Sequence, residues 1–253
     1  MEEKENKKLF GLIGKNISYS FSKKYFSKKF ETLKLHDHDY VNFDLKTLTE
    51  LNQKLEDNKK ELKGMNVTIP YKLEIVDFLD ELEIEAKEIG AVNTIKIRKD
   101  GKLIGFNTDV YGFQKSLEPL LKKHHKCALI LGTGGASKAV AYVLKKLNIS
   151  FVFVSRSKTN KVNSLTYEDL NGDLLNKYTL IINCTPLGTY PNTENAPKIP
   201  YTELGNNHLL YDLIYNPPMT HFLNQGKTQG ATIKNGLEML EKQAEKAWEI
   251  WNK

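Results

Sequence analysis

The chain of 253 residues contains only two cysteines, Cys127 and Cys184, and each lies inside a strand-like apolar run. Two cysteines in such positions indicate neither a disulfide framework nor a metal cluster, and they favour the reducing cytoplasm. No uninterrupted apolar stretch approaches the roughly 20 residues that a membrane span needs. The charged first residues also lack the apolar segment of a secretory signal. We therefore expect a cytoplasmic protein with no membrane partner and no resident metal.

Arginine is as scarce as cysteine. Arg98 and Arg156 are the only arginines, although abundant lysine gives the chain a formal net charge of +6. Scattered lysines are typical of a solvated surface, whereas nucleic-acid readers generally use arginine as well. A basic balance also attracts small anionic ligands. We therefore expect a small molecule, and no nucleic acid, as the partner.

Apolar runs alternate with helical patterns along the chain, which predicts an α/β fold with helices packed on parallel sheets. The pattern restarts near residue 110 and so predicts two domains, with the last helix able to pack back on the first. A hairpin is expected at Asp100-Gly101. The expected strands are 9–14, 40–43, 65–69, 92–97, 103–106, 127–131, 151–154, 180–184 and 209–212. The expected helices are 22–35, 45–55, one opened by Pro70, 110–122, 134–147 and 237–251.

A glycine-rich loop, residues 132–137, lies between a buried strand and a helix. This context is the one that a dinucleotide fingerprint requires. Gly132 permits the tight turn, Gly134 lets backbone amides approach a pyrophosphate, and the helix N-terminus offers its positive dipole to the anion. Ser137 replaces the third glycine of the usual pattern. A tight turn without a ligand is the alternative interpretation of the loop.

The strand that follows ends in Ser155-Arg156-Ser157-Lys158. An NAD site usually carries an acidic residue there for the ribose hydroxyl, whereas an arginine suits the 2′-phosphate of NADP. Two basic residues and two hydroxyls are what a phosphate clamp needs. The sequence therefore favours NADP over NAD, against the alternative of an exposed basic turn.

Four short polar stretches fall at predicted strand ends in the first half, at residues 20–22, 66–72, 91–94 and 106–109. Asn and Thr are costly to bury in apolar strands unless they bind something, and ligands collect at the carboxyl ends of strands. Lys72 and Asp109 could form an acid–base pair there. Each stretch taken singly is interpreted as a helix cap or a turn; Ser22, for example, could be the N-cap of the helix after it. The four together favour a site.

These motifs resemble those of the shikimate dehydrogenase family along nearly the whole chain. The resemblance rests on eight ordered stretches: N-V-T-I-P-Y-K at 66–72, A-V-N-T at 91–94, N-T-D at 107–109, G-T-G-G-A-S at 132–137, S-R-S at 155–157, N-C-T-P-L-G at 183–188, Y-D-L-I-Y at 211–215, and G-L-E-M-L at 236–240 followed by Gln243. It implies the reversible NADPH-dependent reduction of 3-dehydroshikimate to shikimate in aromatic amino-acid biosynthesis. It also implies a substrate-binding domain of residues 1–108 plus 236–253, a Rossmann-like NADP-binding domain of residues 109–235, and a monomer or homodimer.

The resemblance also implies roles for individual residues, with Lys72 and Asp109 as the catalytic pair. The substrate carboxylate would be bound by Ser20 and Ser22. The ring hydroxyls and the rest of the pocket would be contacted by Thr68, Asn93, Asp109, Tyr215 and Gln243. The cofactor would be bound by Gly132, Gly134, Gly135, Ala136, Ser155, Arg156, Ser157, Gly236 and Met239.

The sequence departs from the family pattern around the two serines and in the phosphate clamp. Asn16, Tyr19 and Lys23 stand where the family usually has Pro, His and Pro. The resemblance therefore does not extend to the shape of the loop that carries the two serines. Ser155 and Ser157 replace the usual Asn and Thr. Two rival functions stay open: a quinate/shikimate dehydrogenase of broader cofactor use, and a non-catalytic metabolite-binding regulator on the same fold.

Overall fold

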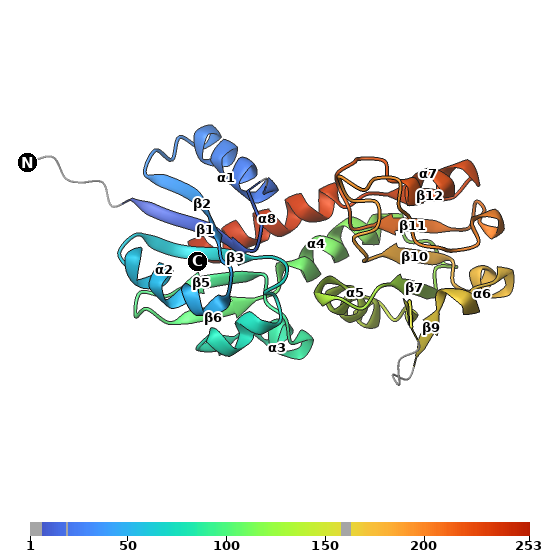
Figure 1. Ribbon diagram of the computed structural model, residues 1–253, viewed down its shortest axis with the longest axis horizontal. Helices are drawn as coiled ribbons and strands as arrows, with labels where there is room; N and C mark the ends of the chain where they lie inside the picture. Colours follow the sequence, from blue (N-terminus) through green and yellow to red (C-terminus); the bar gives the residue numbers. More distant parts are fainter. Residues whose placement is uncertain (1–6, 19, 158–162) are drawn as a thin grey trace, which may run out of the picture. The chain divides into compact units, whose positions relative to one another are not determined.

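The computed structural model describes residues 7–18, 20–157 and 163–253 (Figure 1). The chain forms two compact units: the first comprises residues up to Thr108 together with Ala244–Lys253, and the second is Asp109–Gln243. Each unit contains a six-stranded sheet with helices, so the α/β class expected from the sequence is confirmed. None of the helices in the described part of the chain combines the length and apolar character needed to traverse a lipid bilayer.

The first unit is built on a mixed sheet with the strand order β2-β1-β3-β5-β6-β4. Its elements are β1 (Lys8–Gly14), α1 (Phe21–Thr32), β2 (His38–Asp44), a 3-10 turn (Leu48–Glu50), α2 (Leu51–Asp57), β3 (Leu62–Val67), a second 3-10 segment (Glu74–Phe78), β4 (Glu81–Leu82), α3 (Ile84–Ile89), β5 (Thr94–Ile97) and β6 (Leu103–Phe106). Strands β2, β1 and β3 are parallel, whereas β5 is antiparallel to β3 and β6. The hairpin expected at Asp100-Gly101 therefore joins β5 to β6.

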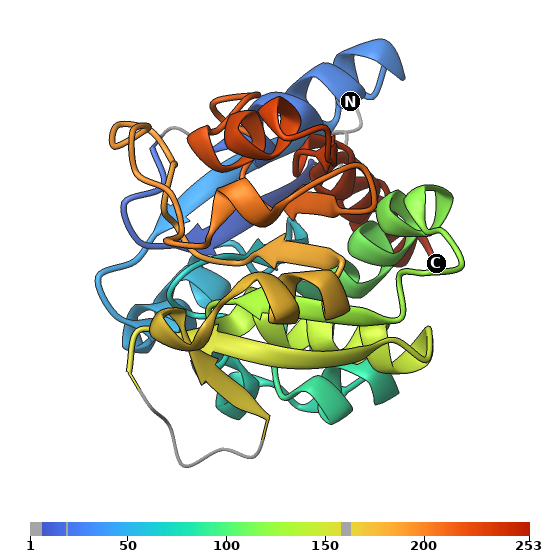
Figure 2. The same ribbon diagram turned by 90° about the vertical axis from the view of Figure 1, so that its right-hand side faces the viewer.

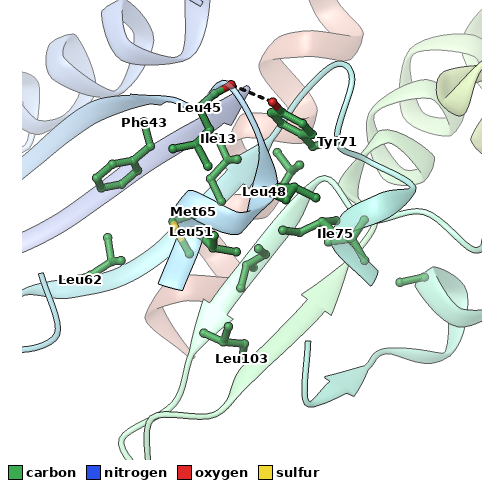
Figure 3. Packing of buried hydrophobic residues seen from close by; sticks show 14 of the residues in the cluster. Ile13, Phe43, Leu45, Leu48, Leu51, Leu62, Met65, Tyr71, Ile75 and Leu103 are labelled. Atoms are coloured by element: carbon green, nitrogen blue, oxygen red, sulfur yellow. Dashed lines mark hydrogen bonds between the residues drawn. The ribbon is translucent and has the colours of Figure 1, made fainter. Parts of the chain in front are cut away.

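Both faces of this sheet are buried, and β1 shows why. Alternate side chains of a strand point to opposite faces. Leu9 and Ile13 pack into one apolar cluster with β3 and the segments that follow β2, which Figure 3 shows from close by. Phe10 and Leu12 pack into another with α1 and with the end of α8 (Leu237–Asn252), including Trp251. The last helix therefore returns to the first unit, as the sequence analysis allowed.

The helix expected after Pro70 is absent, and that prediction was wrong. The Ile69–Pro70 bond is cis, and the amide of Tyr71 donates to the carbonyl of Thr68 at 3.0 Å. The buried Tyr71 hydroxyl then donates to the Leu45 carbonyl at 2.7 Å, drawn as a dashed line in Figure 3. Because this bond attaches Tyr71 to the core, the chain after Pro70 forms a series of turns, and the 3-10 segment Glu74–Phe78 follows them.

The second unit is built on a wholly parallel sheet with the order β12-β11-β10-β7-β8-β9, of which Figure 2 gives a second view. Its elements are α4 (Thr108–Leu117), a 3-10 turn (Glu118–Leu120), β7 (Cys127–Leu131), α5 (Gly135–Lys146), β8 (Ser150–Ser155), β9 (Ser164–Thr166), a 3-10 turn (Tyr167–Asp169), α6 (Gly172–Lys177), β10 (Leu180–Asn183), a 3-10 turn (Tyr201–Glu203), β11 (Leu209–Asp212), α7 (His221–Thr228), β12 (Thr232–Lys234) and the first part of α8. The sheet grows to one side of β7 and then, from β10 on, to the other. Ligands of such sheets bind outside the carboxyl ends of the strands at this switch point.

The boundary between the units differs from the expected one near the start of α8. Residues 236–243 belong to the second unit, although they were expected with the first. The amide of Gly236 donates to the carbonyl of Ile214 at 3.0 Å. A side chain on Gly112 of α4 would meet the Met239 carbonyl at 2.4 Å, so α8 lies directly on α4 there. These contacts hold the first turns of α8 to the second unit.

Candidate functional site

The glycine loop lies at the switch point of the second sheet, directly after β7. Gly132 has φ +101°, a conformation that favours glycine. A Cβ added to Gly134 would meet nothing within 4 Å, so the space beside this backbone is open. Helix α5 begins at the next residue, Gly135, and has no acidic residue in its first turn. Its N-terminal amides and dipole therefore suit an anion, which is what the pyrophosphate of a dinucleotide needs.

Ser137, the departure from the third glycine, turns into the protein. Its hydroxyl donates to the Gly134 carbonyl at 2.6 Å, and its amide donates to the same carbonyl at 3.1 Å. The residue is only 1% exposed. The serine therefore closes the first turn of α5 without filling the open space at Gly134, and the loop fits a dinucleotide despite the substitution.

A second turn, residues 183–188, lies against the glycine loop at the end of β10. The Asn183 side-chain oxygen accepts from the Thr185 amide at 3.0 Å and from its hydroxyl at 2.6 Å. A Cβ on Gly132 would come within 3.0 Å of the Thr185 methyl group. Close approach and positive φ together therefore require glycine at position 132.

Tyr215, Gly236, Met239 and Gln243 all lie in the second unit. Tyr215 is half-buried beyond the end of β11, and Gln243 is half-buried on α8. A Cβ on Gly236 would collide with the Leu213 carbonyl at 2.1 Å, so only glycine fits there. Met239 is buried in the next turn. All the expected cofactor residues thus share this unit with three of the expected substrate residues, Asp109, Tyr215 and Gln243.

The expected phosphate clamp lies at the end of β8. Arg156 and Ser157 are exposed, whereas the Ser155 hydroxyl donates to the Ser157 carbonyl at 2.7 Å and so holds the turn itself. Burial raises the pKa of Tyr167 to about 12, and the positive charge of Arg156 acts in the opposite direction, which places the arginine near this ring. Lys158 lies outside the described residues.

Three of the four polar stretches meet at one edge of the first sheet. Because β5 runs antiparallel to β3 and β6, its amino end lies beside their carboxyl ends. The Val92 amide donates to the Lys72 carbonyl at 2.8 Å, and the Asn93 amide donates to the Phe106 carbonyl at 3.1 Å. Residues 66–72, 91–94 and 106–108 are therefore bonded to one another, as the sequence analysis expected of a site.

Asn93 is the centre of this edge and is 2% exposed. Its side-chain oxygen accepts from the Thr108 amide at 2.7 Å, from the Thr108 hydroxyl at 3.1 Å and from the Thr94 hydroxyl at 3.2 Å. An amide oxygen that accepts these bonds fixes the orientation of the whole side chain. The side-chain oxygen of Asn93 is therefore directed at Thr94 and Thr108.

The remaining polar stretch is joined to the others through Tyr40, a residue that the sequence analysis did not single out. The buried Tyr40 hydroxyl donates to the Asn66 side-chain oxygen at 2.8 Å and is hydrogen-bonded to Ser22. The Asn66 amide in turn donates to the Thr94 hydroxyl at 3.1 Å. No local signal identifies Tyr40, because a tyrosine in an apolar strand is ordinarily part of the core.

The loop before α1 is held by β2. The carboxylate of Asp44 accepts from the amides of Asn16 at 2.8 Å and Ile17 at 3.3 Å, and Asn16 has φ +57°. Ser20 occupies the N-cap position of α1, but its hydroxyl does not cap the helix. Ser22, which the alternative interpretation treats as the cap, lies inside the helix instead. Tyr19 lies outside the described residues.

The expected catalytic pair is divided between the units. Lys72 is half-buried in the turns after β3, close in sequence to the half-buried Thr68. Asp109 is 2% exposed in the first turn of α4 and directly follows Thr108. Since Lys72 belongs to the first unit and Asp109 to the second, their pairing stays a prediction.

Comparison with known proteins gives a consistent result. A family model described as the shikimate dehydrogenase substrate binding domain matches residues 12–95. The shikimate dehydrogenase (NADP(+)) of Methanococcus maripaludis is 38% identical over 96% of this chain and 91% of its own, and that of Clostridium botulinum is 40% identical over 95% of both. The structure of shikimate 5-dehydrogenase from Thermus thermophilus in complex with NADP(H) and shikimate has a TM-score of 0.84 and 28% identity, and it covers 96% of this chain and 92% of that one.

Proposed function

Because the chain belongs to the shikimate dehydrogenase family, we propose that it catalyses the reversible, NADPH-dependent reduction of 3-dehydroshikimate to shikimate in aromatic amino-acid biosynthesis. The observation that carries the proposal is the polar edge of the first sheet in a chain whose second sheet carries a glycine loop at its switch point. A dehydrogenase needs both a polar substrate site and a dinucleotide site. The relatives named shikimate dehydrogenase (NADP(+)) match nearly the whole chain, so the similarity covers both the unit with the polar edge and the unit with the glycine loop.

The cofactor site would be formed by the residues at the end of β7 and β8. Gly132, Gly134, Gly135 and Ala136 would hold the pyrophosphate, and Arg156 would pair with the 2′-phosphate. Ser155 and Ser157 would shape this turn, since the Ser155 hydroxyl already donates to a carbonyl within it. Gly236 and Met239 would lie beside the nicotinamide. NADPH supplies the hydride, and the protein positions it and supplies the proton.

The substrate site would be formed by the polar edge of the first sheet. The hydroxyls of Ser20 and Ser22 would donate to the substrate carboxylate. Thr68, Asn93, Tyr215 and Gln243 would contact the ring and its hydroxyls. The fixed orientation of the Asn93 side chain supports this role, because it holds a polar group in place at this edge.

Lys72 and Asp109 would carry the acid–base chemistry. Reduction builds negative charge on the carbonyl oxygen, which the ammonium group of Lys72 stabilises and then protonates. Asp109 would orient the lysine and a neighbouring substrate hydroxyl. A metabolite-binding regulator would need only one charged anchor, so the presence of both residues favours an enzyme.

The cytoplasmic location and the monomeric or dimeric state stay predictions from the sequence. The two cysteines are free in the structure, which agrees with a reducing compartment. Size-exclusion chromatography with light scattering would determine the oligomeric state.

The test of the proposed function is the absorbance of reduced nicotinamide during oxidation of shikimate, with NADP and NAD compared side by side and then with quinate as substrate. We expect rapid turnover with shikimate and NADP only. Equal use of NAD, or turnover of quinate, would instead favour the broader quinate/shikimate dehydrogenase. No turnover with any pair would leave the metabolite-binding regulator.

A further inference from the structure

Asp212, the last residue of β11, is a fully buried carboxylate that the chemistry proposed above does not use. In the part of the chain that the structure describes, no lysine, arginine or histidine forms an ion pair with it. A buried carboxylate without a cation is costly, so its hydrogen bonds must offset the loss of water. Those bonds lead to the cofactor site.

One oxygen of Asp212 connects two turns that are distant in sequence. Oδ1 accepts from the side-chain amide of Asn183 at 3.0 Å and from the backbone amide of Ile214 at 3.0 Å. The other oxygen, Oδ2, accepts from the hydroxyl of Thr220 at 2.6 Å, the residue that caps α7. The carboxylate therefore has one side directed to the two turns and one side directed to a helix end.

The Asn183 branch reaches the glycine loop. Because its Nδ2 donates to Asp212, the oxygen of the Asn183 amide is the atom that accepts from the Thr185 amide and hydroxyl. A rotated amide would lose all of these bonds. The turn held in this way brings the Thr185 methyl group against Gly132, the first glycine of the loop.

The Ile214 branch reaches the start of α8. The bond from the Ile214 amide fixes the chain directly after β11, and the Ile214 carbonyl accepts from the amide of Gly236. Leu213, between the two anchored residues, is the one whose carbonyl excludes any side chain at Gly236. Tyr215 follows immediately.

We propose that Asp212 is a positioning residue for the cofactor site, whose carboxylate sets, through Asn183 and Ile214, the two turns that lie against Gly132 and Gly236. The inference rests on the proposed function, since it assumes that these glycines contact NADP. Asp212 itself touches neither substrate nor cofactor in this role. Its loss should weaken cofactor binding while the substrate site, built largely on the other unit, keeps its affinity.

The experiment compares Asp212→Ala, Asp212→Asn and Thr220→Val in the full-length chain by NADPH fluorescence titration, steady-state kinetics and thermal unfolding. We expect Asp212→Ala to raise the Kd for NADPH about 10-fold or more, with the KM for shikimate changed by less than about 2-fold, because bonds to a charged acceptor are lost. Asp212→Asn should restore the Kd to within about 3-fold, since its carbonyl oxygen can accept the same two N–H groups.

Thr220→Val is the matched control, because it removes the bond to Oδ2 and the cap of α7 but keeps both bonds to Oδ1. It should lower the thermal midpoint by a few degrees while changing the Kd for NADPH by less than about 2-fold. A merely structural role of Asp212 predicts that both variants lower stability and that neither changes the Kd of the folded protein. If Asp212→Ala does not fold, Asn183→Ala takes its place in the comparison, because it removes the link through Asn183 and keeps the bond to the Ile214 amide.

The inference is overturned if Asp212→Ala and Asn183→Ala bind NADPH as tightly as the wild type, or if Thr220→Val weakens binding as much as they do. A wild-type chain that binds NADPH but does not oxidise shikimate contradicts the proposed function alone, because the Kd comparison still tests Asp212. A wild-type chain that does not bind NADPH overturns both.

Discussion

The burial of Asp212 predicts a specific pH dependence of stability. Burial raises the pKa of this carboxyl from 3.8 to about 6, against the opposing effect of its hydrogen bonds from Thr220, Ile214 and Asn183. A raised pKa in the folded state means that the native protein holds the proton more tightly than the unfolded chain. The associated stability is therefore fully present below about pH 4 and is lost as the pH rises through about 6.

The magnitude follows from the shift of about two pKa units, at about 1.4 kcal/mol per unit, and amounts to about 3 kcal/mol. Asp212→Asn carries no titrating proton, so it removes this dependence. The free energy of unfolding of the variant minus that of the wild type should therefore increase by about 3 kcal/mol between about pH 4 and about pH 7 and stay constant above it. The neighbouring Cys184 and Tyr201 both have raised pKa values and remain neutral throughout this range.

Paired urea unfolding of the two proteins across this pH range measures the difference, and subtraction cancels the exposed carboxylates that titrate equally in both. A difference in the free energy of unfolding that is the same at every pH, whatever its sign, does not bear on this prediction, because only the change with pH reports the titration of Asp212. A difference that varies by less than about 0.5 kcal/mol over the range would refute it, because the buried carboxyl would then titrate as in the unfolded chain.

Three further predictions concern the site. Lys72→Ala should lower kcat by about 100-fold or more and leave the Kd for NADPH unchanged, so near-normal turnover in the absorbance assay would defeat its role as proton donor. Arg156→Ala should reduce the preference for NADP over NAD by about 10- to 100-fold, measured as the ratio of kcat/KM values, whereas equal losses with both cofactors would argue against a contact with the 2′-phosphate. Gly236→Ala should destabilise the fold by about 1–3 kcal/mol, since its Cβ would collide with the Leu213 carbonyl; Gly205→Ala, where a Cβ meets nothing, is the control, and equal unfolding midpoints for the two variants would contradict this steric reasoning.

Local sequence signals were sufficient for much of the fold. Strands β7 and β11 have the expected bounds, because a buried parallel strand is a continuous apolar run that ends where polar residues begin. Helix α5 follows its glycine loop as expected, and α8 matches its stripe of apolar residues to within one residue. The shorter helices α3, α6 and α7, of six to eight residues, were missed because they offer too few turns for a periodic pattern.

The family motifs also predicted which residues form the candidate site, but not how their side chains are held. The sequence predicted that Asn93 belongs to a site. Only the antiparallel pairing of β5 with β3 and β6 decided that the Thr108 amide would fix its side chain. The prediction of a helix after Pro70 was wrong for a similar reason, because the contact of Tyr71 with the Leu45 carbonyl is non-local.

The sequence by itself determined which residue types stand at strand ends, where the glycines fall, and that an arginine follows β8. Each of these depends on neighbours a few positions away. The tertiary structure alone decided that Tyr40 connects Ser22 to Asn66, and that Asp212 receives a donor from Asn183, 29 residues earlier. Such bonds depend on strand order and register, which bring together groups that no local pattern relates.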